Sequence, residues 1–259
     1  MSKLSDRMAG ARLKIERAKE HVDYLDLHIS RFLAGQPYRF PVKNDVESGQ
    51  QIHYVEFTQD IPHVITLTFG DALNNLRASL DYLAWELVGA KGGTQSPRTK
   101  FPIYECWNDA QKAIKHGAVD KVGPEVEKLI RSVQPDQAGY ELLAPLCKLN
   151  NIDKHRTLLM TFIRVGIVEH GIRFGGVAIP TMKFTGSDAR WRELKSGDVF
   201  LVLSEIPPAD REYQPYIKPA FEISFSEAES GCKPRPVGQF VRDLIDTVAK
   251  IAGLFEPHV

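Results

Sequence analysis

Residues Gly70 to Gly89 read GDALNNLRASLDYLAWELVG, and this segment supplies the central helix of the predicted fold. Its leucines recur every three or four residues, which is the spacing of one face of an α-helix, so the sequence predicts a helix from Asp71 to Gly89. Apolar residues cover most of the circumference, and only Asn75, Ser79 and Glu86 share a narrow polar strip. A helix of this kind is buried on most sides. Gly70-Asp71 is a candidate N-cap, and Gly89 with Gly92-Gly93 is the expected end.

Two charged residues border the leucine stripe of this helix. On a helical wheel with Leu73 at zero, Arg77 lies at about 40°, Asp81 at about 80° and Asn74 at about 100°. Arg77 and Asp81 are therefore expected to be half-buried, one helical turn apart. A charge beside an apolar core needs a partner.

A second segment, LNNIDKHRTLLM at Leu149 to Met160, has the same character. With Leu142 at zero, Asp153 falls at about 20° and Arg156 at about −40°, on the inward side. Asn151 and His155 point elsewhere, one turn apart. We therefore predict that Arg77 meets Asp153 and that Asp81 lies near His155 or Arg156. Removing one partner of a buried pair costs about 3–5 kcal/mol, so truncation of Asp153 is expected to be severe.

The polar residues of the two segments allow two interpretations. In one, Asn74, Asn151, Asp153 and Arg156 belong to a satisfied polar network that locks two helices together. In the other, Arg77, Asp81 and His155 line a small catalytic site. An open cleft around the cluster favours catalysis, whereas complete pairing behind sealed loops favours the structural role.

Composition excludes several classes of protein. The 259 residues include 43% apolar and 25% charged residues, which are ordinary globular values. Lys and Arg total 33, as do Asp and Glu, so the net charge of zero does not indicate RNA or another polyanion as a partner. No apolar run has membrane-span length, and MSKLSDRMAG has no signal-peptide core, so we expect a cytoplasmic protein without a membrane partner.

Motifs for cofactor or metal chemistry are absent from the sequence. It contains no GxGxxG, GxxxxGK[ST], HExxH, GxSxG or EF-hand loop. Cys106, Cys147 and Cys232 are widely separated and form neither a CxxC pair nor a zinc spacing. We expect no cofactor and no metal site, and we expect Cys147 to be part of the core.

Both ends of the chain carry a narrow apolar seam. The N-terminal seam alternates between steps of four and three residues and consists of Leu4, Met8, Ala11, Ile15, Ala18, Val22, Leu25, Ile29 and Phe32. It predicts a long helix that ends at Gly35 and Pro37. Val237 to Phe255 repeats the pattern between Pro236 and Pro257. These helices either pack within one subunit or, for the first seam, form a homodimer.

The segments between these helices favour strands and short helices. A hairpin is expected from Tyr38–Val42 and Ile52–Phe57, and a second around His170-Gly171. Two further strands are expected at Asp198–Ile206 and Tyr216–Ser226. Short helices are expected at Asn108–His116, Pro124–Ser132 and Tyr140–Leu149.

This order of elements predicts an α+β protein. We expect a helical bundle with long N- and C-terminal helices, packed with an antiparallel sheet of about six strands. A single domain is expected over residues 1–259: helix-rich over 1–160, strand-rich over 161–226 and closed by a helix over 236–256.

Four segments together resemble a widespread family of uncharacterised bacterial proteins that is frequent in actinobacteria. They are GDALNNLRASLDYLAWELV, FPIY at Phe101 to Tyr104, LNNIDKHRTLL and RPVGQFVRDLIDTVAKIAGLF. The similarity covers nearly the whole chain and is most specific in the central helix and in NIDKHR. It implies an architecture and a bacterial source, and it carries no activity.

The central helix is also similar to the HEPN superfamily of helical ribonucleases and toxin components. Their motif is an Arg followed four to six residues later by a His on one helix, and the pair acts on RNA at a dimer interface. In this chain Tyr82 stands at that distance after Arg77, which removes the expected acid–base group. His155 is the candidate to replace it, with Arg77 holding a phosphate.

Two functions follow from these observations. The first is a non-catalytic binding or interaction protein with a structural Arg/Asp/His cluster. The alternative is a HEPN-like, metal-independent ribonuclease, or a toxin–antitoxin or defence component, that uses Arg77, Asp81 and His155.

Overall fold

The computed structural model describes residues 6–155, 161–174, 177–183, 192–193, 195–203, 213–225, 231, 233 and 235–259. Contacts between Cα atoms divide the chain into two compact units. The helical unit comprises Met1–His28, His63–Met160 and Phe225–Val259, and the strand unit comprises Ile29–Pro62 and Thr161–Ser224. The mixture of helices and antiparallel strands confirms an α+β fold, while the single domain over residues 1–259 stays a prediction.

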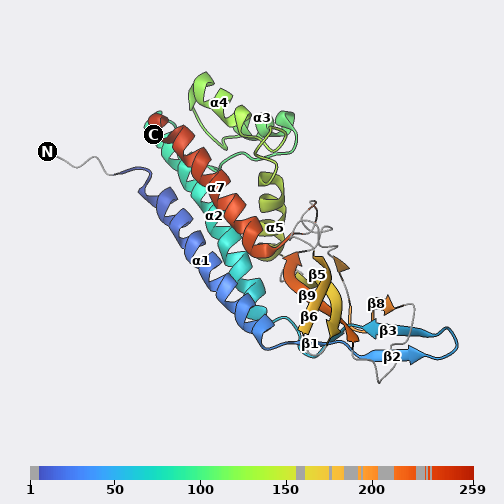
Figure 1. The fold of residues 1–259 in the computed structure, drawn as a ribbon. Helices are drawn as coiled ribbons and strands as arrows, with labels where there is room; N and C mark the ends of the chain where they lie inside the picture. The colour runs from blue at the N-terminus through green and yellow to red at the C-terminus, as the bar shows by residue number, and fades with distance from the viewer. Residues whose placement is uncertain are drawn as a thin grey trace. The chain divides into compact units, whose positions relative to one another are not determined.

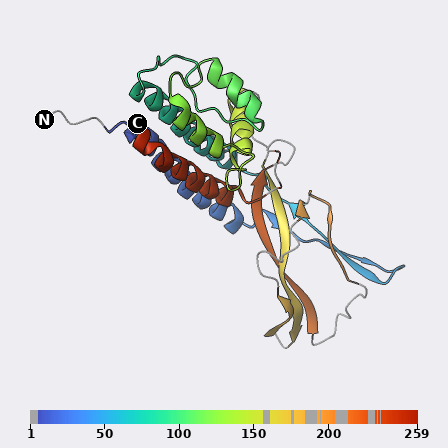
Figure 2. The same ribbon diagram turned by 90° about the horizontal axis from the view of Figure 1, so that it is seen from above.

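The described part of the chain contains six α-helices. They are α1 (Ala9–Ala34), α2 (His63–Ala90), α3 (Trp107–Lys115), α4 (Gly123–Ser132), α5 (Leu143–His155) and α7 (Val237–Phe255), followed by a 3₁₀ turn at Glu256–His258. Within the helical unit, α1, α2 and α7 run alongside one another, and α5 lies against α2 (Figures 1 and 2). The central helix predicted from Gly70–Gly89 is therefore α2, with helices on several of its faces.

Helix α2 ends where the sequence indicates but begins earlier. Gly92 has a φ of +71°, and the N–H of Gly93 donates a hydrogen bond to the carbonyl of Val88 (2.8 Å), which closes the last turn. The predicted start at Asp71 is wrong, because the helix already begins at His63. Gly70 lies inside the helix, where a Cβ would come within 2.5 Å of an Asp153 carboxylate oxygen in α5. This glycine allows α2 and α5 to approach closely and is not a cap.

The N-terminal seam is buried inside the helical unit. Its described residues from Met8 to Leu25 are at most 5% exposed. The hydroxyl of Ser79 in α2 donates to the carbonyl of Ala11 in α1 (2.9 Å), so α1 packs over the narrow polar strip of α2 at this residue. Asp26 of α1 is also ion-paired with Arg242 of α7. The described seam residues therefore pack within one subunit, and a homodimer through the first helix stays a prediction.

Aromatic rings fill the centre of the helical unit. Phe225 is fully buried, and its ring centroid lies 4.6 Å from that of Phe240 and 5.8 Å from that of Phe69. At another point, the ring of Phe255 in α7 meets the ring of Phe101 edge-on at 5.5 Å. Edge-to-face and offset contacts of this kind add stabilisation beyond burial alone.

The strand unit contains three antiparallel arrangements, not one sheet of six strands. The strands are β1 (Tyr38–Arg39), β2 (Val42–Asp45), β3 (Gln50–Tyr54), β4 (Glu56–Phe57), β5 (Thr161–Phe174), β6 (Val177–Lys183), β7 (Arg192–Glu193), β8 (Val199–Leu203) and β9 (Tyr213–Phe225). β1 pairs with β4, β2–β3–β8 form a second sheet, and β5 pairs with β6, β7 and β9. Pro41 separates β1 from β2 because proline has no N–H for the ladder, which explains part of the division.

The predicted hairpin turn at His170-Gly171 is also wrong. Strand β5 continues through these residues, and the pairing with β6 shifts register between them. The pairing of β5 with β6 extends past these residues to Phe174 and Val177, which pair with each other. Arg164 of β5 is ion-paired with Glu222 of β9 at 2.6 Å, and both side chains are largely buried. This pair holds two strands of the same sheet together.

Candidate functional site

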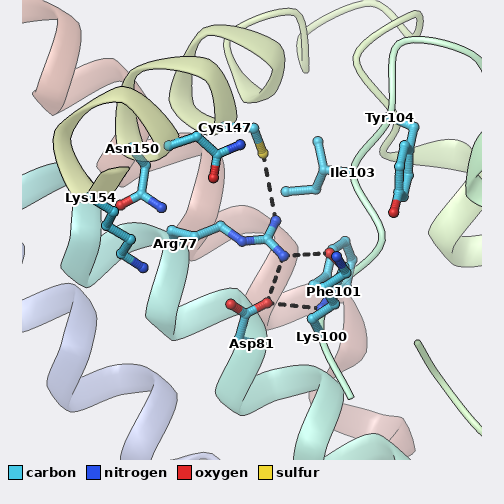
Figure 3. Close-up of a pocket in the computed structure, with 10 residues that line it drawn as sticks. Arg77, Asp81, Lys100, Phe101, Ile103, Tyr104, Cys147, Asn150 and Lys154 are labelled. Atoms are coloured by element: carbon cyan, nitrogen blue, oxygen red, sulfur yellow. Dashed lines mark hydrogen bonds and ion pairs between the residues drawn. The ribbon is translucent and has the colours of Figure 1, made fainter. Parts of the chain in front are cut away.

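Arg77 occupies the centre of a polar cluster in the helical unit. Its side chain is only 11% exposed. One guanidinium nitrogen, Nη2, donates to Asp81 Oδ1 (2.6 Å) and to the carbonyl oxygen of Phe101 (2.7 Å) (Figure 3). The other, Nη1, lies 3.6 Å from Cys147 Sγ of α5. The expectation of a half-buried Arg77 and Asp81 one turn apart is confirmed in this geometry.

Asp81 completes a clamp on the backbone of Phe101. The N–H of Phe101 donates to Asp81 Oδ1 (3.0 Å), while its carbonyl accepts from Arg77. The ion pair therefore satisfies both backbone polar groups of one residue, as a neighbouring β-strand would. Because an unpaired buried backbone group costs about 1–3 kcal/mol, the clamp allows the fully buried Phe101 side chain to enter the core.

A second clamp holds the residues that follow Phe101. Gln134, which is fully buried, donates from Nε2 to the carbonyl of Pro102 (2.9 Å) and accepts from the N–H of Tyr104 at Oε1 (3.1 Å). The FPIY segment is thus fixed along its length, although it belongs to no helix or strand. Its side chains can then form the wall of a cavity.

The predicted pairing of Arg77 with Asp153 is wrong. Asp153 lies against Gly70, two helical turns before Arg77. Arg77 instead uses the nearest carboxylate, Asp81, which is four residues away on the same helix and is positioned without bringing two segments together. Desolvation by burial raises the pKa of Asp153, the negative charge of Asp71 raises it further, and Lys154 opposes the shift. A strong partner would lower that pKa.

The remaining predicted residues are not all brought together. Asn151 lines the same cavity as Arg77 and Asp81. Asn74, on the neighbouring turn of α2, does not line it. The backbone of His155 ends α5, but its side chain and the whole of Arg156 lie outside the described residues, so the predicted contact of Asp81 with either stays a prediction.

A cavity of about 290 Å³ opens beside the clamp. Arg77 and Asp81 contribute from α2, and the segment before α3 contributes Lys100 and Tyr104 (Figure 3). Its other lining residues are Phe101, Ile103, Cys147, Asn150, Asn151 and Lys154. Three of these side chains are cationic and one is a carboxylate, and that carboxylate is already paired with Arg77. The lining therefore carries an excess of positive charge.

Asn150 leaves a polar group without a partner at this cavity. The residue is 3% exposed, and its Oδ1 atom has no hydrogen-bond partner among the described residues. A buried acceptor in this state costs about 1–3 kcal/mol. The polar network is therefore not fully satisfied, in contrast to the complete pairing that a purely structural cluster predicts.

Cys147 is not suited to nucleophilic chemistry. Desolvation by burial raises the pKa of its thiol above the ordinary value, and this outweighs the opposing effect of Arg77. The thiolate is the reactive form of cysteine, so a raised pKa keeps the side chain inert at neutral pH. Its contact with Arg77 makes it a packing neighbour of the guanidinium.

Comparison with known proteins found no relative of this chain. No protein-family model, curated protein or solved structure matches the chain. Among the residues that the structure describes, no cluster of His, Cys, Asp and Glu side chains is suited to hold a metal ion. In the same residues, no helix is both long and apolar enough to span a bilayer.

Sequence reasoning missed several residues of the site. Lys100, Tyr104 and Lys154 line the cavity, and Gln134 fixes its wall. FPIY and NIDKHR contain or adjoin the first three, but a helical wheel ranks residues on one helix only. It cannot show that a segment without regular structure folds back over α2. Gln134 follows α4 and has no periodicity to mark it.

Proposed function

We propose that this protein binds a small anionic molecule in the cavity beside Arg77 and is not an enzyme. The observation that carries the proposal is the charge of the lining. Arg77, Lys100 and Lys154 face a cavity in which Asp81 is the only carboxylate among the described lining residues. Arginine and lysine are the side chains that proteins use to hold carboxylates and phosphates.

The two lysines are the residues available to a ligand. Neither Lys100 nor Lys154 is ion-paired with a described residue, and both are exposed at the cavity. Nη2 of Arg77 already donates to Asp81 and to the carbonyl of Phe101. The contribution of Arg77 to ligand binding is therefore mainly a fixed positive charge close to the ligand. Asn150 Oδ1 offers an acceptor for a hydroxyl or amine group of the same molecule.

A non-catalytic role is supported by how Asp81 and Cys147 of the lining are held. Asp81 is fixed by Arg77 and the Phe101 N–H, and burial raises the pKa of the Cys147 thiol. A general base accepts a proton from the substrate, whereas Asp81 Oδ1 already accepts from the Arg77 guanidinium and from the Phe101 N–H. The Arg77–Asp81 pair therefore acts as a wall of the binding site.

Inorganic phosphate is the simplest probe for this site. A bound anion raises the melting temperature according to RT ln(1 + [L]/Kd), so thermal unfolding at constant ionic strength reports occupancy. We expect phosphate to stabilise the wild-type protein and to have a smaller effect on Lys100→Gln and Lys154→Gln. Lys128→Gln in α4 is the control, because Lys128 is exposed and lies outside the cavity. Equal phosphate effects in all four proteins would refute the proposal.

A second candidate function is the HEPN-like ribonuclease. It is favoured by the observation that Asn151 and Lys154, on the last turn of α5 before His155, line the same cavity as Arg77. Tyr82, at the position of the motif histidine, is 48% exposed and packs over Gly10 of α1. His155→Ala tests this function on single-stranded RNA. Cleavage by the wild type that is lost in a variant of unchanged stability would establish it and replace the non-catalytic role.

A further inference from the structure

A second cavity adjoins the first. Its volume is about 370 Å³, and it shares the side chains of Lys100 and Tyr104 with the cavity beside Arg77. The remaining lining residues are Pro97, Arg98, Ala113, His116 and Ala118. Lys100 and Tyr104 therefore line both cavities, at the place where the two adjoin on the helical unit. Each hollow is close to the lower end of the usual size of ligand pockets, roughly 300–1,000 Å³.

The lining of the second cavity, like that of the first, carries an excess of positive charge. Arg98 and Lys100 line it, His116 adds an imidazole, and the described lining contains no carboxylate. The Arg98 side chain is exposed and forms no ion pair with another described residue. Positive groups therefore lie in both hollows, with Lys100 common to them.

Apolar groups lie with these cations. Tyr104 belongs to both linings, Ile103 and Phe101 belong to the first, and Pro97 with two alanines belongs to the second. Such surfaces suit hydrocarbon or a ring and offer nothing to a highly hydrated inorganic ion. The combination matches a molecule with acidic groups at its two ends and a less polar middle.

We propose that the two cavities together bind one small organic dianion. One acidic group lies beside Lys154 and Arg77, the other beside Arg98 and His116, and the middle of the molecule passes Lys100 and Tyr104. This inference rests on the proposed anion-binding function and names its ligand class. Because the second contact is made by a group already tethered at the first, it strengthens binding without a second loss of translational freedom.

Linear dicarboxylates of increasing chain length are the test ligands, with the monocarboxylate of the same length as the reference for each. Isothermal titration calorimetry at constant ionic strength gives the two dissociation constants. We expect one chain length at which the dicarboxylate binds about ten-fold or more tightly than its monocarboxylate, since a tethered second contact commonly adds that much. Arg98→Gln should remove this advantage and leave the affinity for inorganic phosphate unchanged. His116→Gln is a second variant of the same cavity, and Lys128→Gln is the control.

The possible results separate this inference from the function on which it rests. Phosphate binding that depends on Lys154, together with no advantage for any dicarboxylate, would overturn the dianion and leave the anion site intact. An advantage that survives both Arg98→Gln and His116→Gln would also overturn it, because the second acidic group would then lie elsewhere. Absence of both phosphate and dicarboxylate binding would instead refute the proposed function itself.

Discussion

At the scale of single residues, the ion pair of Arg77 and Asp81 behaves as a substitute for a strand. It supplies one donor and one acceptor to the same residue, Phe101, and so permits an irregular segment to cross a buried surface. Asp81 is 36% exposed and Arg77 only 11%, so solvent reduces the electrostatic strength of the pair. Its value lies in satisfying the backbone, more than in the attraction between the two charges.

Substitutions in the clamp should therefore differ in cost. Arg77→Met leaves the Phe101 carbonyl without its donor and the Asp81 carboxylate without its ion-pair partner, and we expect a loss of about 2 kcal/mol of unfolding free energy. Asp81→Asn keeps an acceptor for the Phe101 N–H and should cost less. Urea unfolding measures both. Arg17→Met is the control, because Arg17 and Glu20 form an exposed pair expected to contribute less than about 0.5 kcal/mol. Equal losses for Arg77→Met and Arg17→Met would contradict the clamp.

Asp153 should behave in the opposite way to a residue in a strong ion pair. Its pKa is raised in the folded state, from an ordinary value of 3.8, so the folded protein binds more protons than the unfolded protein between the two values. Stability is therefore expected to fall as pH rises through that window, and the ionised carboxylate destabilises the fold at neutral pH. Asp153→Asn should be at least as stable as the wild type at pH 7, with the difference vanishing below about pH 3.8. Severe destabilisation at pH 7 would restore the buried pairing expected from the sequence.

At the scale of elements, the spacing of apolar residues predicts the long helices, because a helix buried along one face needs an apolar residue every three or four positions. The seam from Met8 to Phe32 gives α1, and Val237 to Phe255 gives α7 at the predicted residues. The start of α2 could not be predicted from Gly70. A glycine that permits a close helix crossing cannot be distinguished, in the sequence alone, from a glycine that precedes a helix. The crossing partner, Asp153, is 83 residues away in the sequence (153 less 70).

This close crossing can be tested with two glycines. A Cβ at Gly70 would lie 2.5–2.8 Å from the Asp153 carboxyl group, so Gly70→Ala should cost about 1–3 kcal/mol of unfolding free energy. Gly253 in α7 has nothing within 4 Å of a Cβ, so Gly253→Ala should stabilise by about 0.5–1 kcal/mol through helix propensity. Adding Asp153→Ala should relieve the cost at Gly70, which a double-mutant cycle of urea unfolding measures. No coupling between the two substitutions would show that the helices do not meet at this point.

At the scale of the whole molecule, the α+β class could be predicted from the sequence, but the strand pairing and much of the candidate site could not. Pairing of β3 with β8 joins residues such as Ile52 and Val202, and nothing in either strand's own pattern specifies the other. The site was predicted in part: Arg77, Asp81 and Asn151 share a cavity, whereas Asp153 does not line it. Distant segments meet through packing, which local patterns do not encode.

Burial of the N-terminal seam predicts how much stability the protein loses when a seam residue is truncated. Leu25 is fully buried in the helical unit, so Leu25→Ala should lower the unfolding free energy by about 2–4 kcal/mol at every protein concentration. Leu13→Ala, at a residue 69% exposed on the same helix, should change it by less than about 0.5 kcal/mol. Thermal unfolding over a hundred-fold range of protein concentration distinguishes the alternatives. A midpoint that rises with concentration in the wild type and loses that dependence in Leu25→Ala would indicate a dimer through the seam.

The most direct test of the anion site is the affinity of inorganic phosphate measured by isothermal titration calorimetry for wild type, Lys154→Gln and Lys128→Gln. A charge-assisted contact is worth roughly 1–3 kcal/mol, less where solvent screens it, so Lys154→Gln should weaken binding by about five-fold or more. Lys128→Gln should bind as the wild type does. A Kd for Lys154→Gln that equals that of Lys128→Gln would show that phosphate does not bind beside Lys154.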